Sequence, residues 1–491
     1  MPQAESRRVR EALIAKLRDI LPRQFVLTET EQLRPYECDG LTAYRQLPWI
    51  VVLPSNSEEV EKILALCTAC GVPVVARGAG TGLSGGALPH PHGVLLSMTR
   101  LNRILSVDRA NRTARVQPGV RNIAISEEVE GMGLYYAPDP SSQIACSIGG
   151  NVAENSGGVH CLKYGLTVHN ILKLEVVLMS GESVTIGADA LDMPGYDLLA
   201  LMTGSEGMLG VVTEVTVRLL PKPAVARVIL AAFDDLAVAG NAVAAIIGAG
   251  IIPGGLEMMD NPAIRAVEDF VHAGYPRDAA ALLLCELDGT ESEVEAGIRV
   301  VTRILELQGA TEIRVATDEA ERQRFWSGRK NAFPAVGRIS PDYYCIDGTI
   351  PKKRLGEVLT GISKLSNEYD LRVANVFHAG DGNLHPLILY DGSQPGEFER
   401  TEALGGKILE LCIAVGGTIT GEHGVGVEKL NQMCVQFEAP ELAQFHAIKK
   451  AFDPAALLNP GKAVPTLSRC AEFNAMHVHK GRLPFPELPR F

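Results

Sequence analysis

Four polar residues in the C-terminal half of the chain have the types and spacing of a metal site with a base beside it. His378 and His385 flank a turn in HAGDGNLH, and Glu422 and His423 are adjacent in GEHGVG. Apolar runs on both sides of the first motif predict a hairpin, or a strand that turns back, which aims both imidazoles at one point. We therefore expect His378, His385 and Glu422 to converge. A purely structural role for the two histidines is the alternative.

The chemistry of this set favours a divalent ion. Two imidazoles and one carboxylate suit zinc and leave a coordination position open for a substrate, although iron and manganese tolerate the same ligands. His423 is then a candidate general base, because a neutral imidazole can remove the proton of a hydroxyl group. A metal bound to the same oxygen would stabilise the developing alkoxide. A structural role for His423 is the alternative interpretation.

A glycine-rich loop in the N-terminal half indicates different chemistry. The segment VVARGAGTGLSGG, which begins at Val74, is an apolar run followed by a loop whose main-chain amides can close around a diphosphate. A match to G-x-G-x-x-G begins at Gly80, but that pattern indicates a nicotinamide fold only when a helix follows, and Pro89 and Pro91 forbid one. The loop predicts a large anionic cofactor held outside a Rossmann fold. A glycine-rich surface turn without a ligand is the alternative.

Length, composition and charge limit the class of protein. The chain has 491 residues, and its net charge of -12 argues against nucleic acid as the main partner. The start, MPQAESRRVREALIAKL, lacks the apolar stretch of a signal peptide, so we expect a cytoplasmic protein. Residues 236–256 carry no charge, but their Ala and Gly content, with Asn241 and Pro253 among them, predicts a buried helix and a strand rather than a membrane span.

The sequence pattern divides the chain into four parts. We expect a helical segment over 1–45, a cofactor-binding domain over 46–223, an α+β domain over 224–466 and a tail over 467–491. The boundary near residue 223 rests on Pro221 and Pro223 and on a change to strands that alternate with charged helices, which predicts an open sheet covered by helices.

Within the first domain, Ser55 is expected to cap a helix that runs to Cys70, with Glu58 at capping-box spacing. The glycine-rich segment 138–167 is expected to interrupt regular structure, and such a loop in a compact domain is usually functional. Strands are expected over 94–98, 104–108, 113–116, 172–179, 211–219, 228–233, 281–287 and 311–315, and a charged helix is expected over 291–307.

Two further motifs complete a family pattern. PDPSSQIACSIGGNVAENSGGVHCLKYGLT spans 138–167 and TGSEGMLGVVTEV spans 203–215. Together with the first loop and the histidine motifs, they resemble FAD enzymes of the vanillyl-alcohol oxidase type and, within them, the D-2-hydroxy acid dehydrogenases that include the bacterial glycolate enzymes. The likeness covers nearly the whole chain. It implies an α+β fold with a two-subdomain FAD-binding domain followed by a helix-covered open-sheet substrate domain.

The resemblance also assigns cofactor contacts. It implies that the FAD pyrophosphate is held by Arg77, Gly78, Ala79, Gly80, Thr81, Gly82 and Ser84. It implies that the ribityl chain and isoalloxazine are lined by Pro138, Ser147, Gly149, Gly150, Asn155, Gly158 and Thr167. Glu206 and Val212 would complete the adenosine side, and Asn459 would lie close to the flavin. Thr81 stands where some relatives attach flavin through a histidine, so FAD is expected to be non-covalent, with Cys146 near enough to leave an exception open.

The resemblance finally implies the reaction. Arg329 matches the substrate-binding arginine of the family, and a guanidinium holds a carboxylate in a bidentate fork; without that match a solvated helix arginine is the simpler interpretation. Phe333, Cys345 and Leu387 replace polar groups of relatives that take a dicarboxylate, so a short monocarboxylate is expected, glycolate first and D-lactate second.

Hydride would pass from the substrate α-carbon to flavin N5, and a second flavin subunit and an iron-sulfur subunit would take the electrons onward. Any contact with the inner face of the cell membrane would come through those partners. The alternatives are a D-lactate dehydrogenase that acts alone and an electron-relay subunit without turnover of its own.

Overall fold

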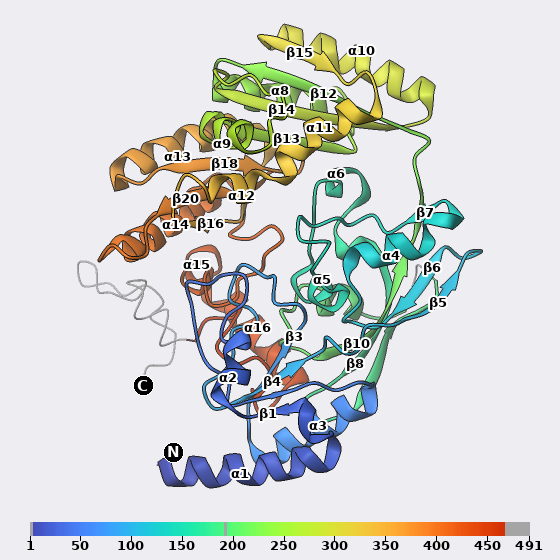
Figure 1. Ribbon diagram of the computed structural model, residues 1–491, viewed down its shortest axis with the longest axis vertical. Helices are drawn as coiled ribbons and strands as arrows, with labels where there is room; N and C mark the ends of the chain where they lie inside the picture. The colour runs from blue at the N-terminus through green and yellow to red at the C-terminus, as the bar shows by residue number, and fades with distance from the viewer. Residues whose placement is uncertain (1–2, 191–193, 467–491) are drawn as a thin grey trace. The chain divides into compact units, whose positions relative to one another are not determined.

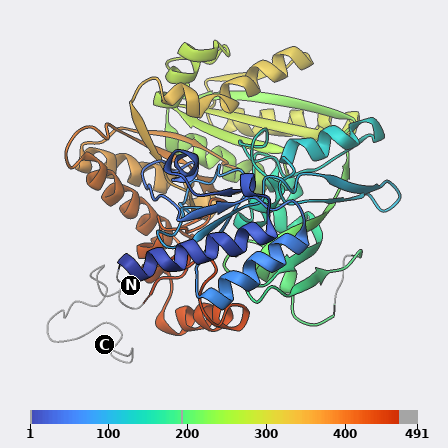
Figure 2. The ribbon, with the colours of Figure 1, turned by 60° about the horizontal axis from the view of Figure 1, so that its bottom comes forward.

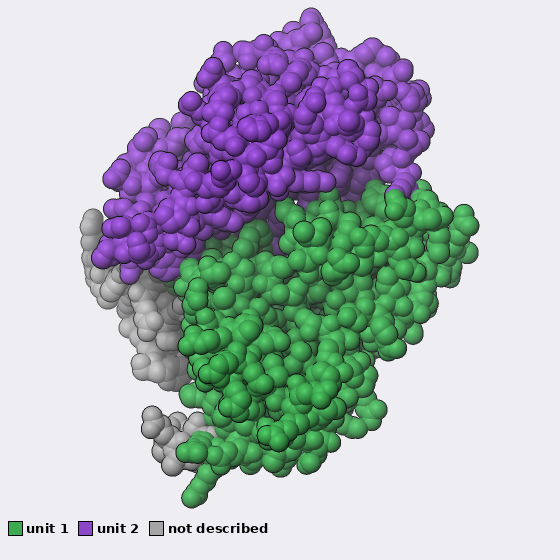
Figure 3. All heavy atoms as spheres, in the orientation of Figure 1, with its two compact units in different colours: residues 1–156, 166–221, 423–491 green, residues 157–165, 222–422 purple. Residues whose placement is uncertain are grey.

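The computed structural model describes residues 3–190 and 194–466. The chain forms two compact units, coloured separately in Figure 3. Within the described residues, the first unit comprises 3–156, 166–190, 194–221 and 423–466, and the second comprises 157–165 and 222–422.

The first sheet of the first unit carries the glycine-rich loop. Its strand order is β1 (Val26–Leu27), β2 (Ile50–Val52), β4 (Val94–Ser97) and β3 (Val74–Arg77), with β2, β3 and β4 parallel. Short apolar runs such as IVV are buried, as expected for strands covered on both faces. The helices α1 (Gln3–Ile20) and α3 (Ser57–Cys70) lie beside one another and pack on this core (Figure 2).

The second sheet of the first unit is antiparallel. Its order is β5 (Ile104–Asp108), β6 (Thr113–Val116), β10 (Val211–Arg218), β8 (Ile171–Val177) and β9 (Ser183–Gly187). A separate apolar core joins it to α4 (Asn122–Val129) and α5 (Ile148–Glu154). The remaining helices and strands of this unit are α2 (Thr30–Leu33), β7 (Leu134–Tyr135), α7 (Leu198–Met202), β11 (Leu220–Pro221), α15 (Leu430–Gln436) and α16 (Ala439–Phe452). Its 3-10 turns are Arg23–Phe25, Arg34–Tyr36, Glu130–Met132 and Thr167–His169.

The second unit is built on a seven-stranded antiparallel sheet (Figure 1). Its order is β15 (Glu312–Val315), β12 (Val225–Phe233), β14 (Ala281–Gly289), β13 (Gly255–Asp260), β18 (Val373–Phe377), β20 (Pro386–Tyr390) and β16 (Asp342–Cys345). A short pair, β17 (Gly348–Thr349) and β19 (Asn383–Leu384), accompanies it.

Helices cover both faces of this sheet, as Figures 1 and 2 show. On one face pack α9 (Asn261–Val271), α11 (Glu319–Lys330) and α12 (Ala332–Val336). On the other face, α8 (Leu236–Gly248) and α10 (Glu291–Leu307) contact β12 and β14. The helix α13 (Leu355–Tyr369) packs next to α8, and α14 (Glu397–Ala414) packs next to α13. The unit also contains α6 (Cys161–Tyr164) and the 3-10 turn Lys352–Arg354.

Several local predictions are confirmed. The bounds of β5, β6 and α10 agree with the sequence pattern, and residues 236–256 form the helix α8 and the beginning of β13. No helix follows β3 before α4 in this part of the chain, which agrees with the rejection of a Rossmann turn.

Two local predictions are wrong. Asn56, not Ser55, caps α3, because its side chain accepts the amide of Glu59, while the Ser55 amide donates to the Glu59 carboxylate. Segment 138–167 is not wholly irregular, since Ser147 caps the helix α5 and α6 follows. Both Asn56 and Ser147 have polar side chains that accept a main-chain amide of the first helical turn.

The division into units differs from the expected domain bounds at the C-terminal end. Residues 423–466 were expected with the second domain, but they group with the first unit. The physical reason is a set of buried main-chain contacts: Leu458 pairs with Val74 of β3, and the amides of Val425 and Gly426 donate to the Glu206 carboxylate. The expected tail, 467–491, lies outside the described residues.

Candidate active site

The predicted hairpin between the two histidines is confirmed. His378 follows β18 and forms a bridge with Asn383, and His385 precedes β20. Gly382 makes the turn possible, because it has φ +86° and a Cβ there would overlap the carbonyl oxygen of Ile350. The imidazole centroids of His378 and His385 are 5.2 Å apart, with ring planes at 87°.

The three predicted metal ligands come together in the second unit. Oε1 of Glu422 lies 3.3 Å from Nε2 of His378 and 3.0 Å from Nε2 of His385. One ligating atom from each residue lies within 4.8 Å of the other two, and both histidines are almost fully buried. This donor set could hold a divalent ion.

Strand alternation explains why these side chains share one face of the sheet. The apolar core that packs under α9, α11 and α12 includes Met259 of β13, Val376 of β18 and Leu387 of β20. Side chains two residues away lie on the same face, which places Glu257, His378 and His385 beside that core. The polar side chains of the site therefore lie on the same face of the sheet as this apolar core.

Both the side chain and the main chain of Glu422 form hydrogen bonds. The amide of Gly157 donates to Oε2 of Glu422 over 3.0 Å. The fully buried Asp347 accepts the amides of Gly421 and Glu422 at 3.1 and 3.2 Å, and it also accepts the hydroxyl of Thr420. Sequence reasoning missed Asp347; the available signal was an acidic residue two positions after β16, at the end of the run YYCI.

Glu257 is a second residue that sequence reasoning missed. Its Oε1 lies 2.7 Å from Nδ1 of His378, and its Oε2 lies 2.6 Å from Nε of Arg329. Burial opposes ionisation of this carboxyl, but the charges and hydrogen bonds of His378 and Arg329 outweigh it and keep its pKa below the ordinary value. The available signal was a carboxylate in the middle of the apolar strand GLEMMD.

The electrostatics of the ligand cluster have the same origin. Burial alone would lower the pKa of His378, but the facing carboxylates of Glu257 and Glu422 raise that pKa well above its ordinary value. Burial likewise opposes charge on Glu422, yet hydrogen bonds from His378 and His385 hold its pKa well below the usual range. Two acidic side chains therefore favour positive charge between them, whether a proton or a metal ion carries it.

Arg329 lies near the C-terminal end of α11 and is buried to 2% exposure. Its Nη2 atom has no hydrogen-bond partner among the described residues. A buried guanidinium donor without an acceptor is costly, so this atom could donate a hydrogen bond to an anionic ligand.

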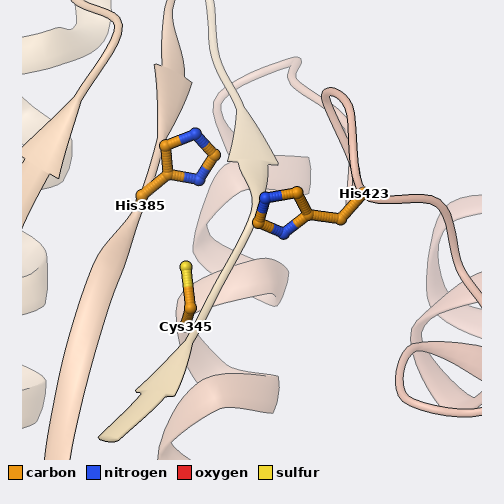
Figure 4. A group of neighbouring side chains, drawn as sticks. All are labelled: Cys345, His385 and His423. Atoms are coloured by element: carbon orange, nitrogen blue, oxygen red, sulfur yellow. The ribbon is translucent and has the colours of Figure 1, made fainter. Parts of the chain in front are cut away.

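The residues expected to restrict substrate size lie in the same unit. Cys345 and Leu387 are register partners across β16 and β20, and both are buried. Figure 4 shows the Cys345 thiol pointing toward the His385 imidazole, and the sulfur lies within 4.8 Å of a ring nitrogen. Phe333 stacks edge-on against Tyr343, with ring centroids 6.0 Å apart. None of Phe333, Cys345 and Leu387 carries a positive charge that could pair with a second carboxylate of a substrate.

The glycine-rich loop of the first unit has the main-chain character that a pyrophosphate needs. Among the described residues, none accepts a hydrogen bond from the amides of residues 79–84. The hydroxyl of Ser84 is also buried without a partner in the described chain. A run of unpaired amides after a strand is an anion-binding arrangement, so the loop fits the diphosphate of a dinucleotide.

Neighbouring residues fix the shape of this loop. Arg77 ends β3 and donates to the carbonyl of Cys38 over 2.6 Å. A Cβ at Gly78 would overlap the Ser147 hydroxyl and a Cβ at Gly80 would overlap the Arg77 guanidinium, so a larger residue at either position would displace one of these side chains. Gly80 has φ +75°, and the loop also contains Ala79, Thr81 and Gly82.

The segment after Pro138 supplies the second group of predicted cofactor contacts. The carbonyl of Pro138 accepts the Asn122 amide, and Ser147 caps α5, which contains Gly149 and Gly150. Asn155 ends α5 with φ 53°, and its side chain accepts the amide of Val168. The buried Thr167 donates to the carbonyl of Ser156, whereas Gly158 belongs to the second unit.

Three predicted contacts have clear protein partners. The Glu206 carboxylate accepts the amides of Val425 and Gly426, both over 2.7 Å. The Asn459 amide donates to the carbonyls of Gly86 and Glu206. Val212 lies in β10 and packs against the core of the antiparallel sheet. Glu206 therefore holds the loop that follows His423. His423 is half-buried and is the first residue of the last segment of the first unit.

Two family models match the chain. The FAD binding domain matches residues 48–187, and the C-terminal domain of FAD linked oxidases matches residues 222–463. The glycolate oxidase subunit GlcD of Escherichia coli (strain K12) is 68% identical over 482 residues, covering 98% of this chain and 97% of that protein.

The chain belongs to the FAD-linked oxidase family. Other relatives of this FAD-linked oxidase are GlcD of Bacillus subtilis (strain 168), 40% identical over 87% of this chain and 91% of that one, and a D-lactate dehydrogenase of Anaerostipes hadrus. The latter is 32% identical over 94% of this chain and 99% of its own length. The protein is therefore a flavoprotein oxidoreductase that binds FAD.

Solved structures confirm the predicted fold class. p-Cresol methylhydroxylase with substrate bound superposes with a TM-score of 0.78 at 18% identity, covering 94% of this chain and 98% of that one. Alkyldihydroxyacetonephosphate synthase gives 0.73 at 18% identity over 92% and 86%. At this identity the likeness concerns the fold alone, which is that of the vanillyl-alcohol oxidase type. None of the described helices of this FAD-linked oxidase combines the length and apolarity needed to cross a membrane.

Proposed function

We propose that this FAD-linked oxidase oxidises glycolate to glyoxylate, with a divalent metal, preferably zinc, bound by His378, His385 and Glu422. The observation that carries the proposal is the convergence of these three side chains beside a buried arginine whose Nη2 lacks a partner in the described chain. The 68% identity to a glycolate oxidase subunit supports the choice of substrate.

The residues of the first unit are suited to hold FAD without a covalent bond. The amides of residues 79–84 would bind the pyrophosphate, and the segments that contain Ser147 and Thr167 would line the flavin. Cys146 is a poor candidate for attachment, because its burial raises the pKa of its thiol and disfavours the thiolate. When bound, FAD supplies the hydride acceptor for oxidation of the substrate α-carbon.

Residues of the second unit would bind and orient the substrate. Nη2 of Arg329 would donate to the glycolate carboxylate, and Glu257 would fix the guanidinium through its Nε. A bound divalent ion would supply Lewis-acid stabilisation at the substrate hydroxyl. His423, one peptide bond after Glu422, would take the hydroxyl proton as general base.

The site favours a small monocarboxylate. Cys345, Leu387 and Phe333 present no cation to a second carboxylate, and an unpaired carboxylate in a buried site is costly. D-lactate is the second candidate, supported by the relative named a D-lactate dehydrogenase. The extra methyl group of lactate changes binding by only about 1–3 kcal/mol, so the choice between the two acids rests on measurement.

Electrons must leave the reduced cofactor. We propose that a second flavin subunit and an iron-sulfur subunit receive them, since two relatives are named as subunits. The protein would then be cytoplasmic and would meet the inner face of the cell membrane only through these partners.

Rapid mixing with substrate under anaerobic conditions tests the proposal. The purified yellow protein should bleach with glycolate, and steady-state turnover with an artificial acceptor should give a higher kcat/KM for glycolate than for D-lactate. A higher value for D-lactate would reassign the substrate. No bleaching with either acid would instead favour an electron-relay subunit.

A further inference from the structure

We infer that Glu257 is a positioning residue that couples the metal site to the substrate site, by holding the ligand His378 and the carboxylate-binding Arg329 with its two oxygens. The inference rests on the proposed function, because it assigns a role to a residue behind those two groups. Glu257 itself would touch neither metal nor substrate.

The geometry makes this carboxylate a bridge. Oε1 lies 2.7 Å from Nδ1 of His378, and Oε2 lies 2.6 Å from Nε of Arg329. The side chain of Glu257 is fully buried, and those of its two partners are 4% and 3% exposed. Each carboxylate oxygen binds one of these two partners, so a change at Glu257 would affect the histidine and the arginine together.

The bond to Nδ1 decides what the other ring nitrogen can do. A carboxylate can only accept, so the proton of a neutral His378 must sit on Nδ1. Its Nε2 then carries a lone pair, and this atom lies 3.3 Å from Oε1 of Glu422 in the ligand cluster. A carboxylate behind a ligating histidine fixes the tautomer and raises the basicity of the ligand.

The bond to Nε orients the arginine. With Nε fixed by Glu257, rotation of the guanidinium is restricted and Nη2 is left as the buried donor without a partner among the described residues. The negative charge of Glu257 also balances a buried cation when no substrate is present, which reduces the cost of keeping Arg329 in the site.

The same unit contains a matched carboxylate that lacks this role. Glu286 on the adjacent strand β14 accepts Arg322 at 2.6 Å and Trp326 at 2.5 Å and lies 3.2 Å from Nε2 of His160. It is buried to 3% exposure and also lies between an arginine and a histidine, but His160 is not part of the metal-ligand cluster.

Substitution by glutamine separates the two functions of Glu257. Arg329 can only donate, so the glutamine oxygen must face its Nε, and the glutamine NH₂ must then face Nδ1 of His378. This arrangement makes Nδ1 an acceptor and moves the proton of the ring to Nε2, where it blocks metal binding. Glu257→Gln should therefore weaken the metal site more than it weakens substrate binding.

The test compares Glu257→Gln with Glu286→Gln in the full-length, FAD-loaded protein. Zinc affinity is measured by titration of metal-depleted protein, and KM for glycolate is measured at saturating zinc. We expect zinc affinity to fall roughly 10- to 100-fold in Glu257→Gln, with a smaller change in KM, and to stay at the wild-type value in Glu286→Gln. Wild-type zinc affinity in Glu257→Gln, or an equal loss in both variants, would overturn the inference.

A second variant covers the case in which Glu257→Gln does not fold. Glu257→Asp keeps the charge, but its side chain is one methylene shorter and cannot reach both partners. Its zinc affinity should fall about tenfold, or its KM for glycolate should rise about tenfold. Wild-type values for both quantities would overturn the inference. Failure of the proposed function is distinguishable, because it would appear in the wild-type protein as absence of bleaching with glycolate.

Discussion

Nε2 of His385 lies 3.0 Å from Oε1 of Glu422, although 37 residues separate the two in the chain. With His378 beside them, these groups form a buried cluster that is chemically suited to a divalent ion.

Replacing His385 by asparagine should remove the metal and most of the activity. The variant loses one of three ligands, so we expect metal content near zero by elemental analysis and a fall in kcat on the order of 10²- to 10³-fold, the effect of losing several kcal/mol of Lewis-acid stabilisation. The flavin absorbance should stay at the wild-type ratio. His160→Asn, outside the cluster, serves as the control and should keep both metal and turnover. Unchanged metal content in the His385 variant would refute the ligand assignment.

Arg329→Lys should weaken substrate binding although it keeps the charge. A lysine ammonium cannot donate to Glu257 and to a carboxylate with the geometry of a guanidinium fork, so we expect kcat/KM for glycolate to fall roughly 10- to 100-fold, carried mainly by KM. Arg322→Lys is the control, because Arg322 lies on the same helix as Arg329 and pairs with Glu286 of β14 and with Glu319. Equal effects of the two substitutions on KM would argue that Arg329 has a structural role only.

Gly80→Ala should reduce FAD binding. Gly80 has φ +75°, where an L-residue costs about 1–2 kcal/mol, and its new Cβ would displace the Arg77 guanidinium. We expect FAD affinity to fall about tenfold or more, measured by fluorescence titration of the apoprotein. Gly131→Ala, which has open space around its Cβ, should bind FAD normally. If the loop is only a surface turn, both variants will retain full affinity.

The pH dependence of stability should contain a contribution from Asp260. Burial raises the pKa of this carboxyl from 3.8 to about 6, although hydrogen bonds from Asn375 and Ala263 oppose the shift. Because the folded state holds the proton more tightly, this contribution to stability is complete below pH 4 and is lost as pH rises through 6. The loss amounts to about 3 kcal/mol.

The measurement is the difference in Tm between the wild-type protein and Asp260→Asn at pH 4.5 and at pH 7.5. The wild-type protein should lose stability relative to the variant as the pH rises. An unchanged or opposite difference would show that Asp260 titrates near its ordinary pKa.

Local sequence was sufficient for the parts of the site that local chemistry builds. Turn residues between His378 and His385 set the hairpin, and apolar runs around them set its strands. The glycines after β3, with two prolines beyond them, determined a loop without a helix. These features depend on neighbours along the chain, so they can be read from it directly. The capping residue of α3 was misplaced by one position because Ser55 and Asn56 are both good caps.

The distant residues that support the site cannot be identified from local sequence. Glu257 is 121 residues from His378 and 72 residues from Arg329, and the strand that carries it lies between β14 and β18. Its neighbours follow from the strand order of the whole sheet, which is selected by burial of many apolar side chains at once. Local sequence specifies the chemical groups and the turns that carry them, whereas the packing of the sheet specifies which carboxylate lies behind which ligand.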